Sequence, residues 1–289
     1  MTALGRRRRG AAIGVLGLAA GLAVGACAIS VDGTPVAAPD PPVRTVACDY
    51  QVAPNAFDSL PTTVPPSVPA DQRDAYLRSM ASLRAGASKQ RSAPQPAPRQ
   101  PETGRVTVTL TTSQGTIPIT VEHTGAPCNA GAVLSLAHSG YYDNTDCHRL
   151  TAAPALKVLQ CGDPTGTGIG GPGWNSPDEF PTDLRPSGPP DPYTGLQAVT
   201  YPRGVVAVAN SNSSGRTHTG DAQFFIVYGD SQIAANYAVI GSVDTAGLGV
   251  VDRVAAGGIA PDLPTETLQD GTPKVRLSIT SATVSRRRE

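Results

Sequence analysis

The stretch RVTVTLTTSQGTIPITV at residues 105–121 decides the fold class of this chain. Residues 106–111 and 116–121 each alternate apolar and polar side chains, which is the pattern of a half-buried strand. Residues 113–115 between them (Ser-Gln-Gly) are typical of a turn. The stretch therefore predicts a β-hairpin within a mainly β fold.

Further strands and two helices are predicted toward the C-terminus. The strand candidates lie at residues 148–150, 156–162, 205–209, 223–228, 238–243 and 275–284. Helices are predicted from Pro127 to Gly140 and from Leu248 to Ala256, because apolar residues recur on one face of each segment and glycine follows it. Eight strands and two helices favour a closed eight-stranded antiparallel barrel with two capping helices, over residues 105–285.

A Pro-rich segment precedes this domain. Residues 27–104 are rich in proline and small residues, which predicts an extended tether. Within it Tyr76, Met80 and Leu83 recur at helical spacing, so we expect one short helix near residues 70–90. Cys48 offers one means of pinning part of this arm to the domain. At the other end, residues 286–289 are interpreted as a solvated basic tail.

Residues 1–26 are interpreted as a signal peptide. Residues 6–9 are four arginines and residues 11–25 are apolar, the order found in secretory signals. The ending LAVGAC at residues 22–27 resembles the bacterial lipobox, which implies lipidation of Cys27. We therefore expect an exported protein anchored in the outer face of the cytoplasmic membrane. An ordinary cleaved signal, with a secreted product, or an uncleaved anchor are the alternatives.

Charge and cysteine content narrow the classes of function. The 289 residues contain 23 Lys+Arg and 23 Asp+Glu, a formal net charge of +0, which argues against nucleic acid as a partner. Besides Cys27 there are four cysteines, which allow two disulfides in three connectivities in an oxidising compartment. No Cys-x-x-Cys pair is present and the four histidines lack ligand spacing, so we expect no metal site. The four cysteines are Cys48, Cys128, Cys147 and Cys161.

Five separated motifs carry a family resemblance. They are GYYDNTDCHRL (residues 140–150), VLQCGDPTGTG (158–168), GGPGW (170–174), PRGVVAVAN (202–210) and AQFFI (222–226). In this order and spacing they are similar to the cyclophilin family of peptidyl-prolyl cis-trans isomerases, most closely to its exported or membrane-attached actinobacterial branch. The resemblance runs from about residue 106 to residue 284. It implies the eight-stranded cyclophilin barrel, no cofactor, and proline-containing polypeptides as clients.

The resemblance also implies the site residues. The catalytic residues are expected to be Arg149, Gln223 and Phe225, where Phe225 forms the floor of a proline pocket. Substrate-binding roles fall to the residues that match the other pocket positions: His148, Val158, Gln160, Ala209, Asn210, Ile233 and Tyr237. The loop between Arg149 and Gln160 is longer than usual. Because Leu156 or Lys157 replaces a pocket phenylalanine, we expect a less aromatic pocket and weak binding of cyclosporin-type ligands.

These residue types suit rotation about a peptide bond. An X–Pro bond isomerises over a barrier of ~18–20 kcal/mol without breaking a covalent bond. A donor aimed at the prolyl nitrogen favours the twisted state over the planar one, and Arg149 is permanently charged. The competing interpretation is a binding module that captures proline-containing segments with little turnover. A weaker third interpretation is a surface adhesion protein, which a long tether would suit.

Overall fold

The hairpin expected at residues 105–121 is formed by β4 (Arg105–Thr112) and β5 (Gly115–Glu122), which pair antiparallel along their whole length. Alternate side chains of both strands, such as Leu110 and Ile119, are buried in the main core. The structure is a computed structural model that describes residues 43–190, 195–213, 215–260 and 268–286.

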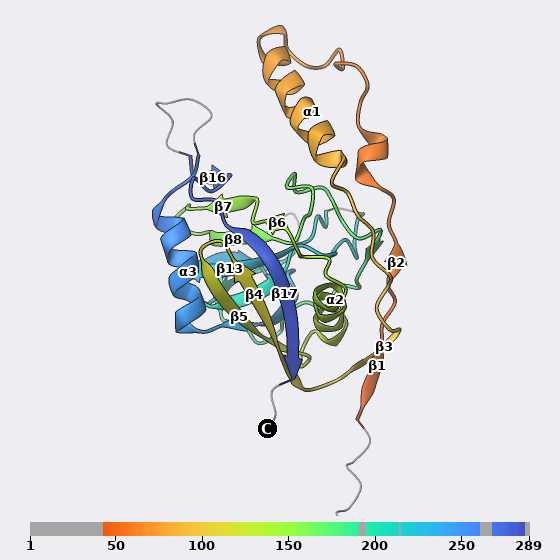
Figure 1. Cartoon of the computed structure of the whole chain (residues 1–289), viewed down its shortest axis with the longest axis vertical. Helices are drawn as coiled ribbons and strands as arrows, with labels where there is room; N and C mark the ends of the chain where they lie inside the picture. The colour runs from red at the N-terminus through yellow and green to blue at the C-terminus, as the bar shows by residue number, and fades with distance from the viewer. Residues whose placement is uncertain (1–42, 191–194, 214, 261–267, 287–289) are drawn as a thin grey trace, which may run out of the picture. The chain divides into compact units, whose positions relative to one another are not determined.

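The hairpin belongs to a single antiparallel sheet of ten strands. Their order is β16-β7-β8-β13-β12-β15-β5-β4-β17-β6 (Figure 1). The remaining strands are β6 (Thr145–Asp146), β7 (Arg149–Thr151), β8 (Lys157–Cys161), β12 (Val205–Val208), β13 (Phe224–Gly229), β15 (Val239–Val243), β16 (Asp270–Gly271) and β17 (Ser278–Arg286). All eight predicted strands are present in it.

The expectation of a closed eight-stranded barrel is corrected in two respects. The short strands β6 and β16 raise the strand number to ten, and in the described residues the hydrogen-bonded ladder ends at β6 on one side and at β16 on the other. Only Cys147 and His148 separate β6 from β7, but β6 pairs with β17 while β7 pairs with β8. The chain therefore changes hydrogen-bonding partners at this bend. The sheet curls into a half-barrel with two edges, which is called the barrel below.

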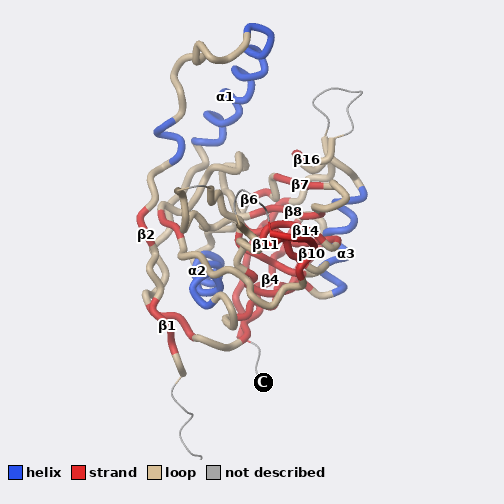
Figure 2. The backbone as a smooth tube through the Cα atoms, turned by 180° about the vertical axis from the view of Figure 1, so that it is seen from behind, coloured by secondary structure: helices blue, strands red, loops and turns tan. Residues whose placement is uncertain are grey.

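The sheet has an apolar cluster on each face. On one face residues such as Leu159, Phe224 and Ile226 join the main core. On the other face a smaller cluster contains Val158 and Phe225, which alternate with core residues along the same strands. This second cluster is covered by a three-stranded sheet of β10 (Pro186–Pro190), β11 (Gln197–Tyr201) and β14 (Ser231–Ala234), shown in Figure 2.

Both predicted helices of the domain are present. The first, α2 (Pro127–His138), starts with proline at its first position and packs on β17 and β5. The second, α3 (Thr245–Ala256), is capped by the Asp244 side chain, which accepts a hydrogen bond from the Gly247 N–H, and packs on β5. Both helices bury one apolar face in the main core.

Residues 43–104 do not form a free tether. They leave and return along the domain and belong to the same compact unit as the sheet. The outgoing pass contains β1 (Thr45–Ala47), β2 (Gln51–Val52) and the short 3-10 helices η1 (Ala56–Ser59) and η2 (Ala70–Gln72). The expected short helix is α1 (Arg73–Ala87), and the returning pass contains β3 (Arg99–Pro101), which pairs with β1 (Figure 1).

Two disulfides resolve the connectivity that the sequence left open. Cys48 pairs with Cys128, which fixes the arm to α2, and Cys147 pairs with Cys161, which joins the chain ahead of β7 to the end of β8. Tyr50 reinforces the first attachment: its hydroxyl donates to the Cys128 carbonyl at 2.8 Å and its ring lies 5.5 Å from Trp174. The arm is therefore held to the rest of the domain by a disulfide, a hydrogen bond and an aromatic contact.

The predicted signal peptide, the predicted lipidation site Cys27 and the last three residues lie outside the described residues. Among those described, no helix has the length and apolar character needed to cross a membrane.

Candidate active site

Strand register places the predicted site residues in one row. Arg149 on β7 pairs with Gln160 on β8, Gln160 pairs with Phe225 on β13, and Phe225 pairs with Ala207 on β12. Paired residues project from the same face of a sheet, and so do residues two apart on one strand. Gln223 therefore shares this face with Phe225. Because side chains alternate between the two faces along each strand, these residues point away from the main core.

Hydrogen bonds connect the polar members of the row. Arg149 Nη1 donates to Gln160 Oε1 at 3.0 Å, and Gln160 Nε2 donates to Gln223 Oε1 at 2.9 Å. Gln223 Nε2 in turn donates to the carbonyls of Gly168 and Gly170 at 3.1 and 3.2 Å. Each amide therefore has its orientation fixed by its neighbours, and the guanidinium lies at one end of the chain of bonds.

The loop that ends this chain of bonds is ordered by one carboxylate. Asp163 is fully buried and accepts hydrogen bonds from the N–H groups of Thr165, Thr167 and Gly168 at 2.6–3.1 Å. A carboxylate that collects several backbone donors fixes a loop strongly. The carbonyls that receive Gln223 are therefore presented by a fixed backbone.

Asp270 binds the other edge of the guanidinium. Arg149 Nε donates to Asp270 Oδ1 at 2.8 Å and Nη2 donates to Oδ2 at 2.6 Å. This bidentate hydrogen bonding raises the pKa of Arg149. The Arg149 side chain is 39% exposed and that of Asp270 is 54% exposed, so the pair remains in contact with solvent. Asp270 therefore holds the guanidinium on one side. On the other side Nη1 faces Gln160 and Gln223, which are called the glutamine row below.

Three aromatic rings gather beside the row. Phe225 and Tyr237 lie 5.4 Å apart, and the buried Tyr201 lies 6.3 Å from each. Tyr201 donates from its hydroxyl to the Tyr237 carbonyl at 3.0 Å and accepts from the Tyr237 N–H at 3.1 Å. The expectation of a less aromatic pocket missed Tyr201, because the strand that carries it was not predicted. Val158 and Ile233 belong to the same apolar cluster.

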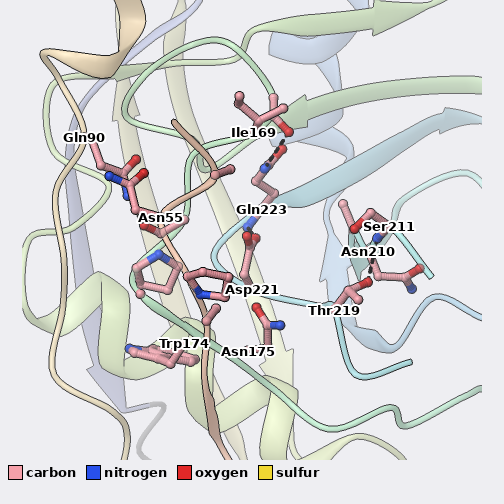
Figure 3. Close-up of a pocket in the computed structure, with 18 of the residues that line it drawn as sticks. Asn55, Gln90, Ile169, Trp174, Asn175, Asn210, Ser211, Thr219, Asp221 and Gln223 are labelled. Carbon is pink, nitrogen blue, oxygen red and sulfur yellow. Dashed lines mark hydrogen bonds between the residues drawn. The ribbon is translucent and has the colours of Figure 1, made fainter. Parts of the chain in front are cut away.

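A cavity of about 760 Å³ adjoins the row. Its wall includes Gln160, Ala209, Asn210 and Gln223, and Ala209 also packs against the apolar cluster. The backbone holds this wall, since the Ala209 N–H donates to the Gln223 carbonyl at 2.8 Å. Figure 3 shows Asn210 and Gln223 at this cavity. Polar amides, an apolar cluster and a cation thus meet at one place on the sheet.

Comparisons with known proteins agree with this geometry. Residues 107–284 match the family model described as "Cyclophilin type peptidyl-prolyl cis-trans isomerase/CLD". The chain belongs to the cyclophilin family. Within that family it is 40% identical over 177 residues to "Probable peptidyl-prolyl cis-trans isomerase B" of Mycobacterium tuberculosis, covering 61% of this chain and 54% of that protein. The resemblance to the actinobacterial branch is confirmed.

Two more cyclophilins illustrate the range of similarity. The protein with the same description in Mycobacterium leprae is 41% identical over 184 residues, covering 64% of this chain and 58% of its own length. The chain therefore spans little more than half the length of these relatives. A solved cyclophilin-type isomerase of Cryptosporidium parvum, in the presence of the dipeptide Ala-Pro, aligns at 22% identity with a TM-score of 0.44 over 63% of this chain and 99% of that one.

The expected substrate-binding role of His148 in this cyclophilin stays a prediction. Both of its ring nitrogens are buried, and neither has a hydrogen-bond partner among the described residues. Burial lowers the pKa of this imidazole. His148 follows the disulfide-bonded Cys147, and its Nε2 would lie 3.5 Å from a Cβ at Gly168, so the ring lies close to the loop that receives Gln223.

Sequence reasoning also missed residues that lie at the site of this cyclophilin. Asp270 precedes a glycine in a segment without strand alternation, so nothing in the sequence connects it to Arg149. Gln90 and Ser92 of the arm line the cavity although they come from the presumed tether. Asp221 is the one residue with a usable signal, because it directly precedes the motif that carries Gln223. Only the folded chain brings these four residues to the site.

Proposed function

We propose that this cyclophilin catalyses cis-trans isomerisation of X–Pro bonds in polypeptides without a covalent intermediate. The observation that carries the proposal is the row formed by Arg149, Gln160 and Gln223 beside Phe225. It combines a cation, amide groups that bind a peptide backbone, and an apolar surface that holds a proline ring. Proline-containing polypeptides are accordingly the proposed clients.

Each part of the row has a task in the proposed mechanism. The proline ring packs on the cluster around Phe225 while the preceding carbonyl rotates. Rotation destroys amide resonance, so the lone pair returns to the prolyl nitrogen. Arg149 donates a hydrogen bond to that nitrogen in the twisted state and to nothing equivalent in the planar state, and this difference lowers the barrier. Gln160 and Gln223 hold the guanidinium and the backbone in place.

The decisive experiment replaces Arg149. We expect Arg149→Ala to lower kcat/KM on a proline tetrapeptide by ~10²–10³-fold, the usual effect of losing a preorganised charged donor. Arg149→Lys should also be impaired, because an ammonium group offers a point charge in place of a planar fork. Arg203→Ala is the matched control, since Arg203 is also 39% exposed and also paired with a carboxylate, that of Asp252. Equal rates for Arg149→Ala and the unvaried protein would refute the proposed mechanism.

A binding module with little turnover is the second candidate. Two observations favour it: Asp270 occupies two donors of Arg149, and Phe225 is only 4% exposed beneath its aromatic neighbours. Such a protein would bind proline peptides without accelerating their exchange. NMR exchange spectroscopy on a proline peptide distinguishes the two, because only an isomerase at substoichiometric concentration produces exchange cross-peaks between the cis and trans signals. Weak binding of cyclosporin-type ligands remains part of either proposal.

We also propose that the clients are exported proteins and that Cys27 carries a lipid anchor. Two disulfides support an oxidising compartment, because such bonds are rare in the cytosol. The LAVGAC ending at residues 22–27 supports lipidation. Labelled fatty acid should enter the full chain in a bacterial host and should not enter Cys27→Ala. Equal labelling of both would exclude this anchor.

A further inference from the structure

The N-terminal arm supplies one wall of the cavity beside the glutamine row. The outgoing pass contributes residues 53–56 and Ser59, and the returning pass contributes residues 90–92. The opposite wall comes from the barrel and includes Gln160, Asn210 and Gln223. Figure 3 shows Asn55 and Gln90 of the arm across the cavity from Asn210 and Gln223. The cavity is therefore built jointly by two parts of the chain that are far apart in sequence.

Hydrogen bonds on both passes fix this wall. The Ala53 N–H donates to the Gly173 carbonyl at 3.0 Å, and Gln90 Nε2 donates to the Gly171 carbonyl at 2.6 Å. The Ala93 N–H donates to Pro172 at 3.0 Å, and Trp174 Nε1 donates back to the Ala93 carbonyl at 2.9 Å. Loop 171–175 is thus bonded to both passes. The arm is a rigid part of the site, as a binding surface requires.

The cavity is larger than the proline and its amide groups require. At about 760 Å³ it is in the range that accommodates a ligand of several residues. It is continuous with the row, because Gln160 and Gln223 belong to both. A bound polypeptide whose proline lies at Phe225 must therefore pass a neighbouring segment along or into this cavity.

The chemistry of the wall favours an uncharged polypeptide segment. The arm and barrel present mainly amides, small residues and backbone, such as Asn55, Ser92 and Asn175. Amide groups both donate and accept, which matches the alternating N–H and C=O groups of an extended peptide. Three side chains of the wall are ionisable. Arg91 donates to the carbonyls of Tyr141 and Asp143, Arg216 donates to the Ser211 hydroxyl at 3.4 Å, and Asp221 accepts from the Gln223 N–H at 2.9 Å, so each is engaged within the protein.

We propose that the N-terminal arm selects substrates: its wall, with Asn55, Gln90 and Ser92, contacts the extended, uncharged segment that adjoins the proline of a client polypeptide. This inference rests on the proposed function for its choice of ligand. The arm then acts as a specificity element: it adds contacts to long substrates and none to a substrate that ends beside the proline.

The experiment compares a short and a long substrate on the full, oxidised chain. The short one is a proline tetrapeptide, and the long one is an uncharged peptide of about ten residues with a central proline, which spans about 33 Å when extended. Ser92→Tyr and Ser59→Tyr place a ring in the cavity from the two passes. Ser82→Tyr is the matched control, because Ser82 is exposed on α1 of the same arm and does not line the cavity.

We expect Ser92→Tyr and Ser59→Tyr to raise KM for the long peptide by about fivefold or more, the effect of losing one well-packed contact. KM for the tetrapeptide and all constants of Ser82→Tyr should change by less than about twofold. Equal losses on both substrates, or no loss on either, would overturn the inference.

A second readout is independent of turnover. Trp174 is the only tryptophan of the chain and lines the cavity. Its emission should change when the long peptide is titrated into the unvaried protein, and much less with the tetrapeptide or in Ser92→Tyr. If no peptide is isomerised but this pattern is found, the proposed catalysis fails and the inference stands. An unchanged emission at peptide concentrations that saturate catalysis refutes the inference alone.

Discussion

The guanidinium of Arg149 is held from two sides by groups of different kinds. Asp270 takes Nε and Nη2, while the neutral Gln160 takes Nη1. A planar fork bonded at both edges loses most of its rotational freedom. The acid therefore fixes the direction in which the remaining donor surface of the cation points, which makes Asp270 a positioning residue in the proposed mechanism.

Replacing Asp270 tests this positioning role. Asp270→Asn keeps the shape but removes the charge-assisted pair, so we expect kcat/KM to fall roughly tenfold through misplacement of the cation. The matched control is Asp252→Asn, which breaks the equally bidentate pair with Arg203 elsewhere on the surface. Since both pairs are exposed, both variants should keep their unfolding free energy within about 1 kcal/mol. A faster Asp270→Asn enzyme would mean that the carboxylate restrains Arg149.

Asp221 predicts a pH dependence of stability. Burial, with the nearby Asp163 carboxylate, raises the pKa of Asp221 from its ordinary value of 3.8 to about 7. Between these values the native state holds a proton that the unfolded chain has lost. The contribution of Asp221 to the free energy of unfolding therefore falls as the pH rises from about 4 to 7, and is constant above that.

The measurement is the difference in unfolding free energy between the unvaried protein and Asp221→Asn across this range. The difference should change between about pH 4 and pH 7 and be flat from pH 7 to 9. Comparing the two proteins removes the contribution of other groups such as Asp146, whose pKa is lowered by Arg276 and Ser278 against the effect of burial. A difference that is independent of pH would show that Asp221 is ionised throughout.

At the scale of elements, β7 and β8 act as one unit because they are joined twice. The backbone ladder pairs Arg149 with Gln160, and the disulfide between Cys147 and Cys161 lies next to both residues. Gly162 follows immediately with a φ of +98°, and a Cβ there would lie 2.3 Å from the Ala222 carbonyl oxygen. At Gly162 the chain segments at the ends of β8 and β13 thus approach one another too closely for a residue with a side chain.

Removing this disulfide should affect both stability and the site. For Cys147→Ala with Cys161→Ala we expect the unfolding free energy to drop by about 3 kcal/mol, because the bond closes a short loop in the unfolded chain. We also expect kcat/KM to fall about threefold or more as the pairing of Arg149 with Gln160 loosens. Urea unfolding and the tetrapeptide assay measure the two effects. Full activity in the double alanine variant would show that this disulfide contributes to stability alone.

At the scale of the whole molecule, the arm and the barrel share one core. Cys48 and Tyr50 of the arm belong to the same apolar cluster as Leu159 and Phe224 of the sheet. Trp174 lies between the arm and the barrel and is 2% exposed. The arm therefore contributes to folding as well as to the cavity, and the domain of this chain is larger than the segment that matches the family.

Removing the disulfide between Cys48 and Cys128 distinguishes the contribution of the arm to folding from its contribution to the cavity. Cys48→Ser with Cys128→Ser should lower the unfolding free energy by about 4 kcal/mol, as expected for a long closed loop. Trp174 emission should shift to the red as water reaches the ring, while the tetrapeptide rate changes little because Arg149 and Gln223 belong to the barrel. A loss of tetrapeptide activity as large as that of Arg149→Ala would show that the barrel depends on the arm for its own shape.

The sequence by itself determined the eight predicted strands and both helices of the domain, and its family resemblance predicted the site residues Arg149, Gln160, Gln223 and Phe225. Alternation and motif spacing are local properties, and a strand shows in its own residues which face it buries. Tertiary structure alone decided that Asp270 binds Arg149, that the ring nitrogens of His148 are buried, and that the arm forms a wall of the cavity. These depend on contacts between segments up to 121 residues apart, and no local pattern records which distant groups will meet.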